Sequence, residues 1–250
     1  MAVDFWTLVA IGFAAQLVDG ALGMAFGLIS STALLTLGLP PAQASAAVHA
    51  AEVATTGVSG LAHAAHRNID RRLFLVLSVA GMTGGVIGAY LLSNVDGKAV
   101  RPIVAAYLFL MGVLVLLKAA RFRPRDHSRP PTHVAPLGLV GGFLDAVGGG
   151  GWGSIVTSTL MGSGEAPRRV IGSVNAAEFF VAVAVSTAFL LELGLNHLEE
   201  ILGLVIGGVL AAPLGAYVVR WARPRMLMTV VGVLICALAA LQLAQAVGWI

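Results

Sequence analysis

Charged residues are scarce in this sequence. Asp, Glu, Lys and Arg make up only 11% of its 250 residues, whereas 58% are hydrophobic. Soluble domains carry about 25% charged residues, because a surface that faces water needs them. A chain this poor in charge cannot cover itself with polar side chains. This excludes the ordinary soluble classes and favours an integral membrane protein.

Two further scarcities narrow the class. The chain has one cysteine, Cys236, which excludes a disulfide framework and a cysteine metal cluster. The net charge is only +3, and the basic residues stand in short clusters between apolar runs. Such clusters mark cytoplasmic loops and do not form a nucleic-acid-binding surface. Asp4 stands where a cleavable signal peptide would be basic, so we expect the first apolar stretch to be retained.

Six apolar segments have the roughly 20 residues that cross a bilayer. They span residues 41–62, 73–92, 103–120, 167–191, 198–219 and 226–247. Two other apolar stretches, residues 5–39 and 136–164, are interrupted midway by glycines. Glycine clusters break helices because they leave the backbone unrestrained. Each stretch is therefore predicted to form two half-helices of roughly 10 to 14 residues that meet near the bilayer midplane.

The chain repeats itself at an offset of 126 residues. This offset pairs Asp19 with Asp145, Gly27 with Gly153, Pro41 with Pro167, His49 with Asn175, and Glu52 with Glu178. Matched acidic residues and prolines in one ungapped frame are hard to obtain by chance. We therefore predict an N-terminal membrane repeat over residues 1–120, a polar, proline-rich cytoplasmic linker over 121–135, and a C-terminal membrane repeat over 136–250.

Equivalent loops of the two halves carry opposite charge. Residues 66–72 are basic, whereas the equivalent residues 192–200 are acidic. Because cytoplasmic loops collect Lys and Arg, the halves should sit in opposite orientations, with both termini outside. Lys98 and Arg101 are the exceptions and fall outside. The predicted fold is an all-α integral membrane protein with two inverted-topology repeats, each a glycine-broken re-entrant helical hairpin followed by three transmembrane helices. This pattern indicates a secondary transporter site.

The helix breaks are the predicted substrate site. Helix N-termini expose N–H groups and partial positive charge, which suit an anion. Close packing through small residues is the alternative, but the four glycines 148–151 exceed what packing needs. The predicted substrate-binding residues are Gly23, Met24, Phe26, Gly27, His49, Gly149, Gly150, Gly151, Trp152, Gly153, Ser154 and Asn175. No metal or cofactor is expected.

Four acidic residues complete this interpretation. Glu52 and Glu178 lie mid-span, where a charge is costly and therefore a functional candidate. Each could carry a proton, or each could support a break by accepting hydrogen bonds from free backbone N–H groups; both roles stay open. Asp19 and Asp145 end the first half-helices, and we interpret them first as caps of the breaks.

Taken together, these motifs resemble the TauE/SafE family of sulfite exporters over residues 7–245. The resemblance rests on residues 19–27 with Pro41 and Glu52, and on residues 145–153 with Pro167, Asn175 and Glu178. It implies a permease of the bacterial inner membrane for sulfite, sulfoacetate or another small sulfur-containing anion, and no enzyme. The expected partners are this anion and the lipid bilayer, with homodimer formation left open and no nucleic acid.

Two other functions compete with a proton-coupled carrier. A passive anion channel could use the same site, and the sequence does not separate the two. An intramembrane aspartyl hydrolase would pair Asp19 with Asp145, but the expected Gly-x-Gly-Asp pattern is missing.

Overall fold

The computed structural model describes residues 4–22, 24–121, 133–162, 167–194, 198–218 and 224–247. Throughout these residues the regular structure is helical, without a strand. The elements are α1 (Phe5–Leu22), α2 (Phe26–Thr36), α3 (Pro41–Ala65), α4 (Arg71–Ser93), α5 (Gly97–Arg121), α6 (Val134–Gly148), the π-helical turn η1 (Gly153–Thr157), α7 (Ser158–Gly162), α8 (Pro167–Leu193), α9 (Leu198–Val218) and α10 (Pro224–Val247).

The six segments predicted to cross a bilayer are all helices. Within the described residues, four of them (α4, α5, α8 and α10) are both long and apolar enough to span a membrane. Helix α3 has 25 residues and α9 has 21, so both also have the length. Polar residues along α3, including Ser45, His49 and Glu52, lower its hydropathy.

The two glycine-broken stretches each form separate helical pieces, but two of these pieces are longer than expected. Helix α1 has 18 residues and α6 has 15, whereas α2 has 11. The helix passes through Gly20, because a single glycine is tolerated inside a helix at modest cost. Helix α6 ends at Gly149, whose φ of 68° is left-handed, a conformation that glycine adopts freely.

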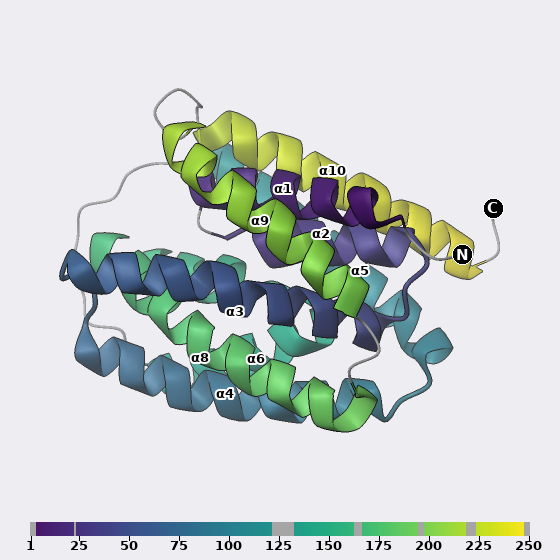
Figure 1. Ribbon diagram of the computed structural model, residues 1–250, viewed down its shortest axis with the longest axis horizontal. Helices are drawn as coiled ribbons and strands as arrows, with labels where there is room; N and C mark the ends of the chain where they lie inside the picture. Colours follow the sequence, from purple (N-terminus) through teal and green to yellow (C-terminus); the bar gives the residue numbers. More distant parts are fainter. Residues whose placement is uncertain are drawn as a thin grey trace.

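Helix pairs from the two halves pack in a reciprocal pattern. Helix α1 packs on α9 and α6 on α4, while α3 packs on α8 and α5 on α10. The offset of 126 residues makes α1 equivalent to α6, α3 to α8, α4 to α9 and α5 to α10. Exchanging each helix for its equivalent leaves this set of contacts unchanged. In Figure 1, α3 ends and α4 begins at the left of the molecule, whereas α8 ends and α9 begins at the right. Equivalent helices therefore run in opposite directions in this view.

Glycines bring the two helices of a pair into backbone contact, both where α4 meets α6 and where α9 meets α1. A Cβ atom on Gly84 would overlap the carbonyl of Leu139 where α4 meets α6. A Cβ on Gly207 would overlap the carbonyl of Val9 where α9 meets α1. Small residues that allow such approach are typical of helix interfaces in membranes, where packing takes over from the hydrophobic effect.

The outer face of the bundle carries large apolar side chains, while several polar and charged side chains are buried in its otherwise apolar interior. Leu61 and Leu191 are 74% and 80% exposed, whereas His49 and Asp145 are 0% and 2% exposed. In a water-soluble protein large apolar side chains are mostly buried, and a large exposed apolar surface marks a site that binds a partner or a membrane. Together with the spanning helices, this surface defines an integral membrane protein with several crossings.

Candidate substrate site at the two helix breaks

The two breaks meet each other in the interior. The Ser31 hydroxyl donates a hydrogen bond to the Gly149 carbonyl, and the Ser154 hydroxyl donates to the Met24 carbonyl at 3.1 Å. A Cβ atom on Gly150 would lie only 2.5 Å from the Leu28 nitrogen. The breaks are therefore packed backbone against backbone, an approach that a residue with a side chain would prevent.

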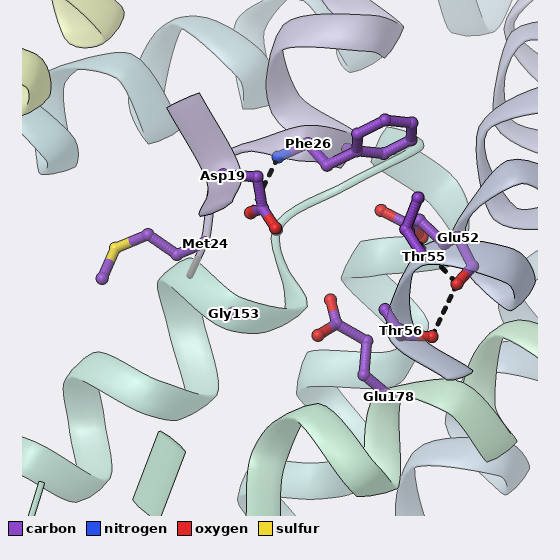
Figure 2. Close-up of a pocket in the computed structure, with 10 residues that line it drawn as sticks. Asp19, Met24, Phe26, Glu52, Thr55, Thr56, Gly153 and Glu178 are labelled. Carbon is purple, nitrogen blue, oxygen red and sulfur yellow. Dashed lines mark hydrogen bonds between the residues drawn. The ribbon is translucent and has the colours of Figure 1, made fainter. Parts of the chain in front are cut away.

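Asp19 and Asp145 each join the two helices across their own break. Asp19 Oδ1 accepts hydrogen bonds from the backbone N–H groups of Ala25 (2.6 Å) and Phe26 (3.2 Å) at the start of α2, as Figure 2 shows for Phe26. Asp145 Oδ1 accepts from the backbone N–H of Trp152 at 2.8 Å. Because Phe26 and Trp152 are equivalent in the repeat, the two aspartates make matching contacts. Each aspartate thus satisfies free backbone N–H groups at the start of the helix that follows its break, as a cap does, although it lies before the break.

A cavity of about 10 Å³ lies where the breaks meet, with room for roughly one water molecule. Figure 2 shows the carboxylates of Asp19, Glu52 and Glu178 pointing toward this space, whereas the Met24 side chain points away from it. None of the described residues that line it is Lys, Arg or His. The lining residues are Asp19, Met24, Phe26, Gly27, Glu52, Thr55, Thr56, Gly151, Gly153 and Glu178.

Glu52 has an open acceptor inside this site. Its side chain is 3% exposed, and its Oε2 atom has no hydrogen-bond partner. Its Oε1 atom lies against Gly27, where a Cβ would be only 2.7 Å away. The Thr56 hydroxyl donates to the backbone carbonyl of Glu52 at 2.6 Å and leaves the carboxyl group untouched. A buried carboxyl oxygen without a partner is available to a proton or to a ligand.

His49 and Asn175 are not among the residues that line the cavity. The His49 ring is fully buried, with Nδ1 2.8 Å from the Ser45 carbonyl oxygen and Nε2 3.2 Å from Asp145 Oδ2. The Asn175 amide donates to the Ile171 carbonyl at 2.9 Å. Both side chains thus contact the carbonyl four residues earlier. We had expected His49 to face a substrate or Glu52, and its hydrogen bonds go to Ser45 and Asp145 instead.

One set of buried side chains has the composition of a metal site. Ligand atoms of His49, Glu52 and Asp145 all lie within 4.8 Å of one another. The direct contact between His49 and Asp145 gives both of these atoms a partner without an ion. We therefore interpret His49 and Asp145 as a hydrogen-bonded pair, with the Glu52 carboxyl group close to it.

The remaining predicted contacts divide between the cavity and the walls of the breaks. Five of them line the cavity: Met24, Phe26, Gly27, Gly151 and Gly153. Gly149, Gly150 and Ser154 instead hold the two breaks together. Trp152 is a core residue, fully buried, with its indole N–H donating to the Val174 carbonyl at 3.3 Å. Gly23 lies outside the described residues.

Sequence reasoning missed four residues at this site. Thr55 and Thr56 follow Glu52 by one helical turn, so helical periodicity alone could have placed them beside it. The Tyr107 hydroxyl donates to the Gly150 carbonyl at 2.9 Å, and the Lys118 ammonium donates to the Ser154 carbonyl. Nothing local marks these last two, because each reaches the break from another helix.

Arg101 also has a structural reason for its position. Its guanidinium donates to the Leu35 carbonyl at 2.6 Å, near the C-terminal end of α2. Carbonyls at the end of a helix lack partners within the helix and carry partial negative charge. The contact gives Arg101, an exception to the predicted charge pattern, a structural role.

These features define a class: a multi-pass helical membrane protein whose broken helices enclose a buried polar site. The chain matches the family model described as sulfite exporter TauE/SafE over residues 8–242, and it belongs to that family of membrane transporters. It is 38% identical over 233 residues to the "probable membrane transporter protein YtnM" of Bacillus subtilis (strain 168), covering 89% of this chain and 77% of that protein. It is 27% identical over 228 residues to the "probable membrane transporter protein ORF9" of Sinorhizobium sp, covering 85% of each. No solved structure matches.

Proposed function

We propose that this protein is a secondary transporter that moves a small sulfur-containing anion, such as sulfite or sulfoacetate, across the bacterial inner membrane. One observation carries the proposal: two broken helical segments, one from each half, meet around a buried cavity lined by their backbone and by acidic side chains. Such breaks at a repeat interface are typical of transporter sites. The family description, sulfite exporter, supports the class of substrate.

The two halves, residues 1–120 and 136–250, act in this proposal as inverted repeats. The reciprocal helix contacts and the opposite directions of equivalent helices in Figure 1 support this arrangement. The loop charges support both termini on the periplasmic side and the 121–135 linker in the cytoplasm. Assembly as a homodimer is part of the same hypothesis.

The charges around the cavity tie anion binding to protons. The N-terminus of α2 supplies partial positive charge, but Asp19, Glu52 and Glu178 point into the same space. An anion beside three ionised carboxylates would be repelled strongly in a low-dielectric interior. Binding is therefore favoured when these groups hold protons, so the anion and the proton should raise each other's affinity.

The size of the cavity supports a carrier that changes shape. A sulfite ion has a sulfur and three oxygen atoms and does not fit a space of about 10 Å³, which suits roughly one water molecule. The breaks must separate before substrate enters.

An aspartyl hydrolase needs two adjacent carboxylates that share a proton. Among the described contacts, Asp19 and Asp145 hydrogen-bond to their own breaks and not to each other.

Flux in proteoliposomes tests the proposal. Purified protein would be assayed with sulfite, sulfoacetate, thiosulfate, sulfate, acetate and chloride, with and without a pH gradient. We expect saturable flux of one sulfur anion that accumulates against its gradient when a pH gradient is imposed. The variants Glu52→Gln and Glu178→Gln should change the pH dependence, whereas Glu192→Gln, an exposed carboxylate that contacts Asn94, should not.

Two results would contradict the proposal. Flux that never saturates and never runs uphill would identify a passive channel. Silence across the panel, from protein shown to be folded, would remove sulfur anions as substrates.

A further inference from the structure

His49 and Asp145 form a buried contact between the two halves of the chain. His49 lies on α3 and Asp145 on α6, and their Nε2 and Oδ2 atoms are 3.2 Å apart, with side chains 0% and 3% exposed. Asp145 is held in place through its other oxygen, which accepts from Trp152 at 2.8 Å. His49 is held through Nδ1 by the Ser45 carbonyl at 2.8 Å. Both side chains are therefore fixed from behind and face each other.

Counting hydrogens shows that this contact needs an added proton. A backbone carbonyl only accepts, so the Nδ1 atom facing the Ser45 carbonyl carries a hydrogen. The Ser45 hydroxyl cannot supply one instead, because it donates to the Ala146 carbonyl at 2.6 Å. A neutral imidazole then has a bare lone pair at Nε2, opposite a carboxylate oxygen that also only accepts. A second hydrogen must sit on Nε2 or on Asp145 Oδ2 for the contact to be attractive.

Either position gives the pair a net charge of zero, as imidazolium with carboxylate or as neutral imidazole with carboxylic acid. Removing that proton leaves neutral His49 beside ionised Asp145, with a net charge of −1 and two lone pairs in opposition. One proton therefore decides whether the contact between the halves is attractive or repulsive.

The groups that face the pair from other helices make this charge matter. Asp145 interacts electrostatically with Glu52 on α3, Glu178 on α8 and Tyr107 on α5. Asp19 on α1 interacts with both glutamates. All these neighbours are acids. The negative charge that stays on the pair when its proton leaves would therefore add to the repulsion that a bound anion meets in the adjacent cavity.

We propose that the His49–Asp145 pair is a proton-binding site of the transport cycle, whose bound proton makes the contact between the halves attractive and favours an anion in the adjacent cavity. This inference rests on the proposed function where it assigns the proton to transport, although binding of the proton itself requires no substrate. The second half has no counterpart, because Asn175 stands at the position equivalent to His49 and an amide does not titrate. The coupling proton is thus bound asymmetrically, on one side of the paired breaks.

The chain supplies its own conservative variant. His49→Asn copies the residue that the second half uses at this position, where Asn175 makes the same contact to the carbonyl four residues earlier. The fold should therefore accept it. Asp145→Asn is the second variant, and its effect on folding is checked separately because Asp145 also caps a break. His63→Asn is the matched control, since His63 lies on the same helix but contacts Asn68 near the helix end.

The experiment has two independent readouts. Infrared difference spectra of reconstituted protein between acidic and alkaline pH report carboxyl and imidazole protonation without any substrate. We expect a pH-dependent band set that is lost in His49→Asn and kept in His63→Asn. Sulfite flux then reports coupling: the ratio of the accumulation that a pH gradient drives to the exchange at equal pH on both sides should fall at least tenfold in His49→Asn and stay unchanged in His63→Asn.

The outcomes separate the two proposals. A wild-type set of bands that survives complete in His49→Asn, or lost bands that require added Zn²⁺ and disappear with a chelator, overturns the proton site even if sulfite is transported. Pair-specific bands in a protein that moves none of the sulfur anions of the panel support the proton site and refute the proposed substrate class. Unchanged gradient-driven accumulation in His49→Asn overturns the coupling role directly.

Discussion

Replacing Gly150 with alanine should separate the two breaks. The new Cβ would lie 2.5 Å from the Leu28 nitrogen and 2.7 Å from the Gly27 Cα atom, both backbone atoms of the other half. Atoms in ordinary contact lie about 3.5 to 4.0 Å apart, so the two segments must move by roughly 1 Å. A flexible side chain could turn aside, but backbone held between helices cannot.

The magnitude follows from the cost of overpacking. Forcing an extra carbon into a closely packed interior typically costs about 1–3 kcal/mol. We expect Gly150→Ala to lower the free energy of unfolding by that amount, measured by denaturant titration of the purified protein in mixed micelles. Flux should fall as well, because the closed arrangement of the two breaks becomes less populated.

A glycine without such neighbours provides the control. A Cβ on Gly97, the first residue of α5, would find its nearest neighbour, Pro41 Cδ, at 3.8 Å, which is ordinary contact. Gly97→Ala should therefore change the free energy of unfolding by no more than about 0.5 kcal/mol. If Gly150→Ala were as stable and as active as Gly97→Ala, the close packing of the two breaks would be wrong.

Three smaller changes test other contacts of the breaks. Asp19→Ala removes the acceptor for the N–H groups at the start of α2 and should lower the free energy of unfolding by about 1–2 kcal/mol. Asp19→Asn should lower it less, and equal losses in the two variants would contradict capping. Lys118→Met leaves the Ser154 carbonyl without its charged donor, so denaturant titration should show a loss of about 1–3 kcal/mol, and Lys118→Arg should recover part of it. Gln242→Leu removes the donor from α10 to the Thr32 carbonyl; we expect a loss of about 1 kcal/mol by the same titration, and no change would show that this contact adds nothing.

The site was only partly predictable from its residues. The sequence correctly placed the breaks in two interrupted stretches, and it singled out Glu52, Glu178 and Asp19, which do point into the cavity. An acidic residue in an apolar run is visible without any structure, because its cost depends only on the apolar surroundings. The contact of His49 with Asp145 was not predictable, since 96 residues separate the two.

Local sequence by itself determined the membrane class, the positions of the helices and the internal repeat. These properties depend on runs of about 20 apolar residues, on glycine clusters and on matched positions, all of which are read along the chain. Tertiary structure alone decided which side chains meet. It directed His49 to Asp145 and not to the cavity, and it brought Tyr107 and Lys118 to the carbonyls of a distant break. The physical reason is that a buried donor must find an acceptor wherever packing supplies one, and packing between helices is not written in the spacing of any single segment.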